Sequence, residues 1–253
     1  MSPSHQTNHQ AFQLSTIGIV HSCYQQKFGI PRQPGLVSEA TARIELLPPF
    51  NRLDVLDGLE SFSHIWVHFI FHACIQDGWK AKIRPPRLGG KTKMGVFATR
   101  ATHRPNPIGL SVIKLGKIYQ QGKKVFIDLH GADLLDGTPV VDIKPYLPYA
   151  DIIEDAEGGF APISTVTRAV IFSEQAESDC AHYTLETGRN IRDLIEQIVS
   201  QDPRPAYLIN ETDREHGMQL WDINIKWQAK SDHFEILRLE TQQEHESRQK
   251  ELN

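Results

Sequence analysis

Short runs that alternate apolar and polar side chains dominate the first 145 residues, and this pattern restricts the possible folds most strongly. A period of two is typical of strands that bury one face. Only 52–61 has a brief helical pattern, whereas βαβ units require a longer helix between strands. We therefore predict a mainly β fold, an antiparallel barrel or sandwich. The expected strands cover 13–22, 40–47, 64–72, 95–99, 111–119, 124–129 and 140–144.

The sequence changes character after this region. Between 145 and 164 it combines three prolines, two glycines and four acids without sustained periodicity, which indicates a linker. A small α+β unit is expected beyond it, with a helix over 190–200, where apolar residues recur at spacings of three and four. Its expected strands cover 165–172, 219–227 and 234–239. The predicted boundaries are 12–150 for the N-terminal domain, 151–164 for the linker, 165–241 for the C-terminal domain, and 1–11 and 242–253 for flexible tails.

The charges of the chain are unevenly distributed. Between Asp77 and Asp128 lie 50 residues without an acid, and they hold 12 of the 27 lysines and arginines. The remaining residues therefore carry 15 cations against all 31 acids, although the net charge is only −4. Such asymmetry indicates a polyanionic partner, and nucleic acid is the first candidate.

Several classes of protein are not expected. No window approaches the roughly 18 consecutive apolar residues of a membrane helix, and no secretory leader precedes the first strand. The three cysteines, with no CxxC pair, suit neither a disulfide framework nor a zinc motif. No G-x-G-x-x-G follows a strand, so a Rossmann-type cofactor site is not predicted. We expect a cytoplasmic protein with no membrane partner.

Three histidines, His64, His68 and His72, recur every four residues in an expected strand. Eight residues of strand span roughly 26 Å, so these imidazoles cannot share one metal ion. We predict no metal site. Two interpretations stay open: hydrogen-bonded side chains on a half-buried face, or a last histidine, His72, that reaches a site at the end of the strand.

The segment 95–109 is rich in residues suited to holding a ligand. Arg100 and Arg104 offer fixed guanidinium donors, and two prolines stiffen the backbone around Asn106. A rigid polar loop of this kind suits ligand binding. The alternative is a proline-stiffened turn with two surface arginines.

This run, GVFATRATHRPN followed by PIGLS, resembles the signature of the TsaA-like family, the TrmO type of tRNA methyltransferase. The resemblance is dense over 25–151 and sparse beyond. Further blocks agree in the same order. They are KFGIPRQPGLV (27–37), GLESFSHIWVHFIFH (58–72), RPPRLGGKTKMG (84–95), GADLLDGTPVVDIKPYLPYAD (131–151) and QDPRPAY (201–207).

The resemblance implies an enzyme that uses S-adenosylmethionine and whose N-terminal domain is a β-barrel, commonly as a homodimer. The implied substrate is tRNA with N6-threonylcarbamoyladenosine beside the anticodon, methylated on N6. A non-catalytic nucleoside- or RNA-binding regulator with the same pocket is the alternative. The implied cofactor contacts are Gln33, Pro34, Gly35, Phe71, His72, Arg100, Ile108, Gly109, Leu110, Leu134, Leu135, Asp136 and Gly137.

The N6 atom of such a substrate is a poor nucleophile until its proton leaves, so an acceptor must lie near it. Our hypothesis places His72, or else Asp136, near that proton. Asn106, Arg104 or a lysine would hold the threonyl carboxylate or the backbone phosphates. The candidates for tRNA binding are Lys82, Arg84, Arg87, Lys91, Lys93, Arg104 and Arg204.

Overall fold

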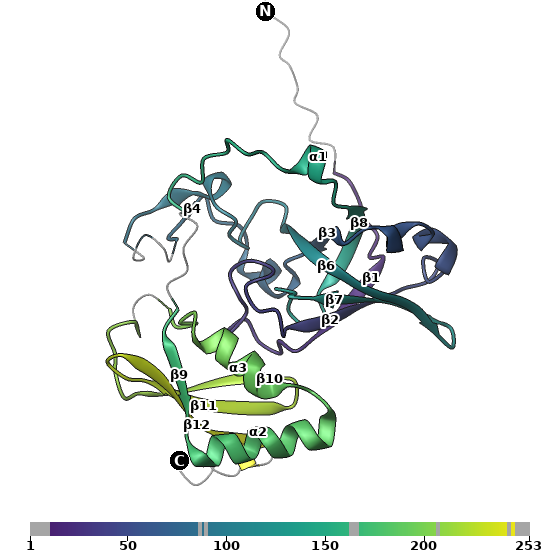
Figure 1. Ribbon diagram of the computed structural model, residues 1–253. Helices are drawn as coiled ribbons and strands as arrows, with labels where there is room; N and C mark the ends of the chain where they lie inside the picture. The colour runs from purple at the N-terminus through teal and green to yellow at the C-terminus, as the bar shows by residue number, and fades with distance from the viewer. Residues whose placement is uncertain are drawn as a thin grey trace, which may run out of the picture.

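Six antiparallel strands close into a barrel in the N-terminal half of the chain (Figure 1). The structure is a computed structural model that describes residues 11–85, 88, 91–161, 167–205, 208–241 and 244–245. The predicted β-barrel is confirmed. In order around the barrel, the strands are β1 (Gly18–Ser22), β2 (Thr41–Leu46), β7 (Lys124–His130), β6 (Ile108–Gln121), β3 (His64–Ile70) and β8 (Pro139–Pro145).

The alternation in the sequence becomes the inside and the outside of this barrel. In β3 every second residue is buried, and Ile65 and Val67 are fully covered. Ile44 from β2 and Ile127 from β7 are paired in register and belong to the same core. Burial of such branched side chains, each worth about 1.5–3 kcal/mol, drives closure of the barrel.

Two segments differ from the predicted elements. The expected strand over 95–99 is a 3-10 helix, η5 (Val96–Ala98), because the Thr99 hydroxyl donates to the Val96 carbonyl at 2.9 Å and closes a turn. The short helix over 52–61 is two 3-10 turns instead, since Gly58, with φ of 85°, separates them. The short elements of this half are η1 (Leu53–Leu56), η2 (Leu59–Ser61), η3 (His72–Asp77), β4 (Lys82–Ile83), β5 (Met94–Gly95) and α1 (Pro148–Asp151).

The C-terminal part is a four-stranded sheet in the order β10-β11-β12-β9, with β9 parallel to β12. The predicted helix over 190–200 is α3, whose Ile191, Leu194, Ile195 and Ile198 are buried as their spacing indicated. The helix α2 was not predicted. The elements are β9 (Ala169–Phe172), α2 (Glu174–Thr187), α3 (Ile191–Val199), β10 (Glu215–Leu220), β11 (Ile223–Ala229) and β12 (His233–Thr241).

The strand expected over 219–227 is wrong, because the chain turns in the middle of it. Trp221 has a φ of 49° and lies between β10 and β11, and its amide N–H donates to the Cys23 carbonyl at 2.8 Å. This contact with a distant part of the chain therefore fixes a turn at a tryptophan, although a bulky residue rarely adopts a positive φ.

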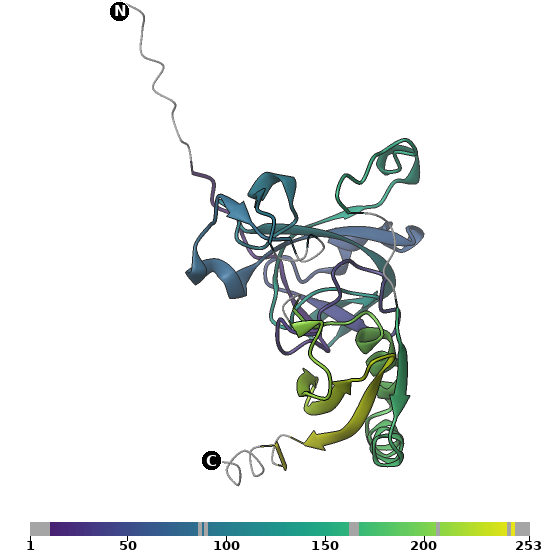
Figure 2. The ribbon, with the colours of Figure 1, turned by 90° about the vertical axis from the view of Figure 1, so that its left-hand side faces the viewer.

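The C-terminal part lies against the barrel (Figure 2), and its apolar core includes residues of the β1–β2 connection. Residues Cys23, Tyr24, Val37 and Ala40 follow β1 in the chain but are buried in one cluster with α3 and the C-terminal sheet, Trp227 included. The backbone of Tyr24 also forms an isolated β-bridge with Leu220. The long connection between β1 and β2, residues 23–40, is thus held from both sides. Across the described residues, no helix combines the length and apolarity needed to cross a membrane.

Candidate functional site

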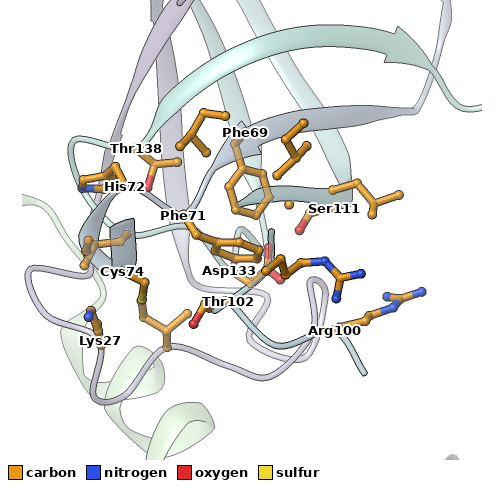
Figure 3. A pocket seen from close by; sticks show the side chains of 18 of the residues that line it. Lys27, Phe69, Phe71, His72, Cys74, Arg100, Thr102, Ser111, Asp133 and Thr138 are labelled. Atoms are coloured by element: carbon orange, nitrogen blue, oxygen red, sulfur yellow. The ribbon is translucent and has the colours of Figure 1, made fainter. Parts of the chain in front are cut away.

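A cavity of about 590 Å³ opens at the end of the barrel where β3 ends and β6 begins (Figure 3). The β1–β2 connection, η3, the signature loop and the turn after β7 complete its wall. Its lining residues are Lys27, Ile30, Pro31, Arg32, Gln33, Phe69, Ile70, Phe71, His72, Ala73, Cys74, Arg100, Thr102, His103, Arg104, Ile108, Gly109, Leu110, Ser111, Asp133, Leu135 and Thr138.

Two phenylalanines form the apolar side of this cavity. The rings of Phe69 and Phe71 meet edge to face, with centroids 5.1 Å apart. Gly109 lies opposite Phe69 in the neighbouring strand, and a Cβ there would stand 2.4 Å from Phe69 Cζ and 2.8 Å from Phe71 Cζ. The glycine therefore leaves the space that both rings occupy, and the half-buried Phe71 offers an aromatic surface for a planar ligand.

The polar side of the cavity contains a cation and an acid. Arg100 Nη1 donates to Gln33 Oε1 at 2.7 Å and so joins the signature loop to the β1–β2 connection. Asp133 lines the cavity as well, and burial raises the pKa of its carboxyl to about 6. Its Oδ1 atom is sealed from solvent and has no hydrogen-bond partner among the described residues. A buried acceptor without a donor is unusual enough to indicate a functional role.

Most of the residues implied as cofactor contacts meet at this cavity. His72 reaches it from the first position of η3, whereas His64 and His68, on the strand itself, do not line it. Of the three histidines, the structure thus brings only His72 to the cavity, and its role there stays a prediction. The implied contacts found in the lining are Gln33, Phe71, His72, Arg100, Ile108, Gly109, Leu110 and Leu135.

The other implied contacts are not part of the lining. The side chain of Leu134 is 1% exposed and belongs to the barrel core. Asp136 Oδ1 accepts the Ser22 amide N–H at 2.8 Å, and the residue does not line the cavity, so the structure does not bring this predicted proton acceptor and cofactor contact to the site. Of the implied contacts, those outside the lining are Pro34, Gly35, Leu134, Asp136 and Gly137.

Gly35 nevertheless shapes the site indirectly. Its amide N–H donates to the Gly131 carbonyl at 2.8 Å, and both glycines have positive φ, 78° and 67°. A Cβ on Gly131 would lie 3.2 Å from Gly35 Cα. This close backbone approach joins the β1–β2 connection to the turn that carries Asp133.

Sequence reasoning missed several lining residues, of which Asp133 and Ser111 matter most. Both carried a recognisable signal. Ser111 is the polar residue at an inward position of β6, 4% exposed among alternating buried residues. Asp133 stands between the buried Ala132 and Leu134, where an acid costs free energy unless it has a use.

The arginines of the signature loop have separate tasks. Arg104 Nη1 donates to the Thr99 carbonyl at 2.7 Å and to the Val96 carbonyl at 3.2 Å, so this guanidinium braces the loop from within. Asn106, predicted as a catalytic residue that holds the threonyl carboxylate or the phosphates, is exposed and does not line the cavity.

The predicted tRNA contacts also differ in their surroundings. Exposed side chains on and beside the β4–β5 hairpin fit the prediction, whereas Arg87 lies outside the described residues. The prediction for Arg204 is wrong: its side chain is 0% exposed, it forms an ion pair with Asp202 at 2.8 Å, and it donates to the carbonyls of Leu208 and Glu211. The exposed candidates are Lys82, Arg84, Lys91 and Lys93.

One group of metal-type donors lies at the rim of the cavity. Ligand atoms of Cys74, Asp77 and His103 lie within 4.8 Å of one another. His103 Nε2 is 3.3 Å from Asp77 Oδ2, while its Nδ1 is 3.2 Å from the Thr102 hydroxyl. These contacts tie η3 to the signature loop.

A closed antiparallel barrel with a nucleoside-sized cavity at its rim, lined by aromatic rings, an arginine and a buried acid, defines a β-barrel ligand-binding protein. Two family models match: the tRNA-methyltransferase O N-terminal domain over residues 19–152, and the TrmO C-terminal domain over residues 165–242. The chain therefore belongs to the tRNA-methyltransferase O family.

Individual proteins agree with this assignment. The tRNA (adenine(37)-N6)-methyltransferase of Escherichia coli is 43% identical over 91% of this chain and 98% of its own. A Pseudomonas aeruginosa protein described as an S-adenosylmethionine-dependent methyltransferase is 49% identical over 85% of this chain and 91% of its own. The crystal structure of TrmO from the same organism superposes with a TM-score of 0.77, at 40% identity, and covers 91% of this chain and 99% of that one.

Proposed function

We propose that this chain transfers the methyl group of S-adenosylmethionine to N6 of adenosine 37 in tRNA. The observation that carries the proposal is the cavity itself: the signature loop of the family forms its wall, and an exposed cationic hairpin stands in the same acid-free stretch. The Escherichia coli relative named for this reaction matches 91% of the chain.

The cavity suits the cofactor by size and by chemistry. Its volume of about 590 Å³ falls within the range of small-molecule sites. Phe71 offers a surface for the adenine, Arg100 a partner for the α-carboxylate, and the turn around Leu135 supplies backbone groups. When bound, S-adenosylmethionine supplies an electrophilic methyl group on a sulfonium. The protein then needs to align the acceptor and exclude water, which a partly apolar pocket does.

For the substrate we propose adenosine that carries a threonylcarbamoyl group on N6. This group ends in a carboxylate, and the cavity has cations to meet it. Lys27 and Arg32 line it from the β1–β2 connection and are exposed, so their charges are available to a ligand. Arg104 is less available because its guanidinium is bonded to backbone carbonyls.

The anticodon arm is proposed to lie along the β4–β5 hairpin. Lys82 and Arg84 come before residue 86, Lys91 and Lys93 come after residue 90, and all four side chains are exposed. Flexible cations contact phosphates without reading sequence, so this surface would orient the tRNA while the cavity selects the base.

A homodimer in the cytoplasm is the proposed form of the protein. Large apolar side chains are exposed around the cavity: Ile108 at 37%, Leu110 at 46% and Phe97 at 78%. Apolar surface of this kind beside a site suits a subunit interface. A mass measured by light scattering in solution tests it, and a monomer at micromolar concentration would contradict it.

Mass spectrometry of tRNA nucleosides tests the reaction. Protein, S-adenosylmethionine and tRNA are incubated, the tRNA is digested, and a mass increase of one methyl group is expected on threonylcarbamoyladenosine. Threonylcarbamoyl-deficient tRNA is the matched control and should gain nothing. If the control tRNA were methylated, the protein would still be a methyltransferase, but threonylcarbamoyladenosine would not be its required substrate. If the cofactor bound without turnover, the protein would be a regulator instead.

A further inference from the structure

The backbone around Asp133 is fixed on both sides. The Ala132 amide N–H donates to the Ala40 carbonyl at 3.1 Å, and the Asp136 amide N–H donates to the Tyr24 carbonyl at 2.8 Å. Between them, the Ser22 hydroxyl donates to the Leu134 carbonyl at 2.7 Å. The Asp133 carboxyl is therefore held at one place in the cavity wall and does not depend on a loose loop.

This carboxyl is also the only acid among the described residues that line the cavity. One of its oxygens is sealed and unpartnered. The neighbouring groups that act on its charge are few: Ser111 from β6 by a hydrogen bond and Arg100 from the signature loop by its positive charge, both of which favour the ionised form. Burial opposes them and dominates, so the pKa of Asp133 is raised to about 6.

Other charged or titratable groups stand nearby. Burial raises the pKa of Tyr24, and the charge of Asp133 adds to that rise, so the phenol stays neutral and does not compete as a base. The remaining charged or titratable lining residues are Lys27, Arg32, His72, Cys74, His103 and Arg104. Asp136, the other acid of this turn, accepts the Ser22 amide N–H and is not part of the lining.

We propose that the Asp133 carboxylate accepts the N6 proton of the adenine during methyl transfer, a role that rests on the proposed function. The proton moves from N6 to a carboxylate oxygen as the new N–C bond forms. The methyl–sulfur bond breaks with its electron pair left on sulfur, so the sulfonium charge and the carboxylate charge disappear together. After product release, Asp133 returns the proton to solvent.

The surroundings of Asp133 suit this task. A general base works best when its pKa lies near the pH of the reaction, because it is then ionised and still basic enough to take a proton. An exposed aspartate, with a pKa near 3.9, is a much weaker base. Partial burial at the wall of the cavity provides the necessary rise without a second acid.

The substitution Asp133→Asn removes the base and keeps the shape of the side chain. The matched control is Asp128→Asn in β7, an aspartate that is half-buried like Asp133 but does not line the cavity. Single-turnover methyl transfer is measured from pH 5 to 9 with saturating S-adenosylmethionine and modified tRNA. For the wild type, the rate should rise with pH to a plateau above about 6. Asp133→Asn should lower the plateau rate about 100-fold or more and abolish this rise, while Asp128→Asn keeps both.

A second readout does not depend on turnover. Because the pKa of Asp133 is higher in the folded than in the unfolded chain, the folded state binds its proton more tightly, and stability falls as pH rises from about 4 through 6. Asp133→Asn removes this loss. The variant should therefore melt at a higher temperature than the wild type at pH 8, and the difference should vanish toward pH 4. Affinity for S-adenosylmethionine, measured by calorimetry, should change less than about threefold.

Each contrary result has a distinct meaning. If Asp133→Asn kept the wild-type rate and its pH dependence, Asp133 would not be the proton acceptor. A loss of cofactor affinity above about tenfold, with an unchanged rate at saturation, would make it a cofactor contact and overturn the proposal. Failure of the wild type itself to methylate tRNA would instead overturn the proposed function, and the acceptor role with it.

Discussion

At the scale of single residues, Gly109 has an effect out of proportion to its size. Gly109→Ala would place a methyl group inside the contact distance of both phenylalanine rings. Overpacking of this kind costs about 1–3 kcal/mol, and here the strain falls on the cavity wall. We expect lower thermal stability and at least a tenfold loss of S-adenosylmethionine affinity, measured by calorimetry.

The control for this variant is Gly95→Ala. Gly95 has an ordinary φ of −60°, and a Cβ there would meet nothing within 4 Å. Its stability and its cofactor affinity should stay close to those of the wild type. Equal behaviour of the two variants would mean that the rings yield to the added methyl group.

Arg204 provides a second prediction at this scale. Its buried guanidinium pairs with Asp202 and bonds two carbonyls, so Arg204→Ala leaves these acceptors unsatisfied and should cost about 3–5 kcal/mol in the free energy of unfolding. Arg214→Ala, which removes an exposed partner of Glu211, should cost less than about 1 kcal/mol. Denaturant unfolding measures both. A large drop in tRNA affinity with unchanged stability would restore Arg204 as a tRNA contact.

At the scale of elements, the β4–β5 hairpin can be separated from the cavity. The double variant Lys82→Glu/Arg84→Glu reverses two exposed charges and should weaken tRNA binding at least tenfold at moderate salt. The dependence of affinity on salt should also become less steep. Affinity for S-adenosylmethionine should stay unchanged, because neither residue lines the cavity.

The matched control is Lys123→Glu. Lys123 belongs to the same acid-free stretch but lies in the turn between β6 and β7, at the end of β6 remote from Ile108 and the cavity. If it weakened tRNA binding as much as the hairpin variant does, the charge of the whole stretch would matter and not the hairpin. Filter binding at two salt concentrations distinguishes these results.

The helices and strands also show how much of the fold could be predicted from the sequence. Period-two alternation predicted the strands of the barrel, because each buries one face against a single core. It failed for 95–99, where a side-chain hydrogen bond closes a turn, and for 219–227, where a contact with Cys23 sets the turn. The helix α2 escaped because its buried face is narrow, only Ala176, Cys180 and Tyr183, although Ser173 and Gly188 mark its ends.

The candidate site was predictable in part, but from the family resemblance and not from periodicity. Residues in recognisable runs, such as Phe71 and Arg100, reach the cavity. The direction of Asp136 could not be predicted, since it depends on the Ser22 amide N–H, which is 114 residues away in the chain. Asp133 was missed because the family resemblance implied Leu134, Leu135, Asp136 and Gly137, and the sequence does not show which acid of this connection faces the cavity.

At the scale of the whole molecule, Gly29 lies where the barrel and the C-terminal sheet meet. A Cβ on Gly29 would stand 2.5 Å from Met218 Sδ, and its φ is 91°. Gly29→Ala should therefore lower stability by about 1–3 kcal/mol and weaken cofactor binding, because Lys27 and Ile30 on either side line the cavity.

Two further variants separate the contact from the backbone strain. Gly58→Ala has a similar φ, 85°, with nothing within 4 Å of the added Cβ, and so reports strain alone. Combining Gly29→Ala with Met218→Ala removes the clashing sulfur, and a double-mutant cycle should show a favourable coupling of at least about 0.5 kcal/mol. If the two substitutions changed the free energy of unfolding additively, the contact of the added Cβ at Gly29 with Met218 would not cause the destabilisation.

Residues 23–40 also affect how this barrel can be reused. The sequence predicts a boundary at 151–164, yet a piece cut there would leave behind the surface that covers Cys23, Tyr24, Val37 and Ala40. Anyone who grafts the barrel onto another protein, or shortens it to a minimal catalyst, must therefore resurface those four positions. Otherwise the grafted barrel would expose an apolar surface on the same connection that lines its cavity.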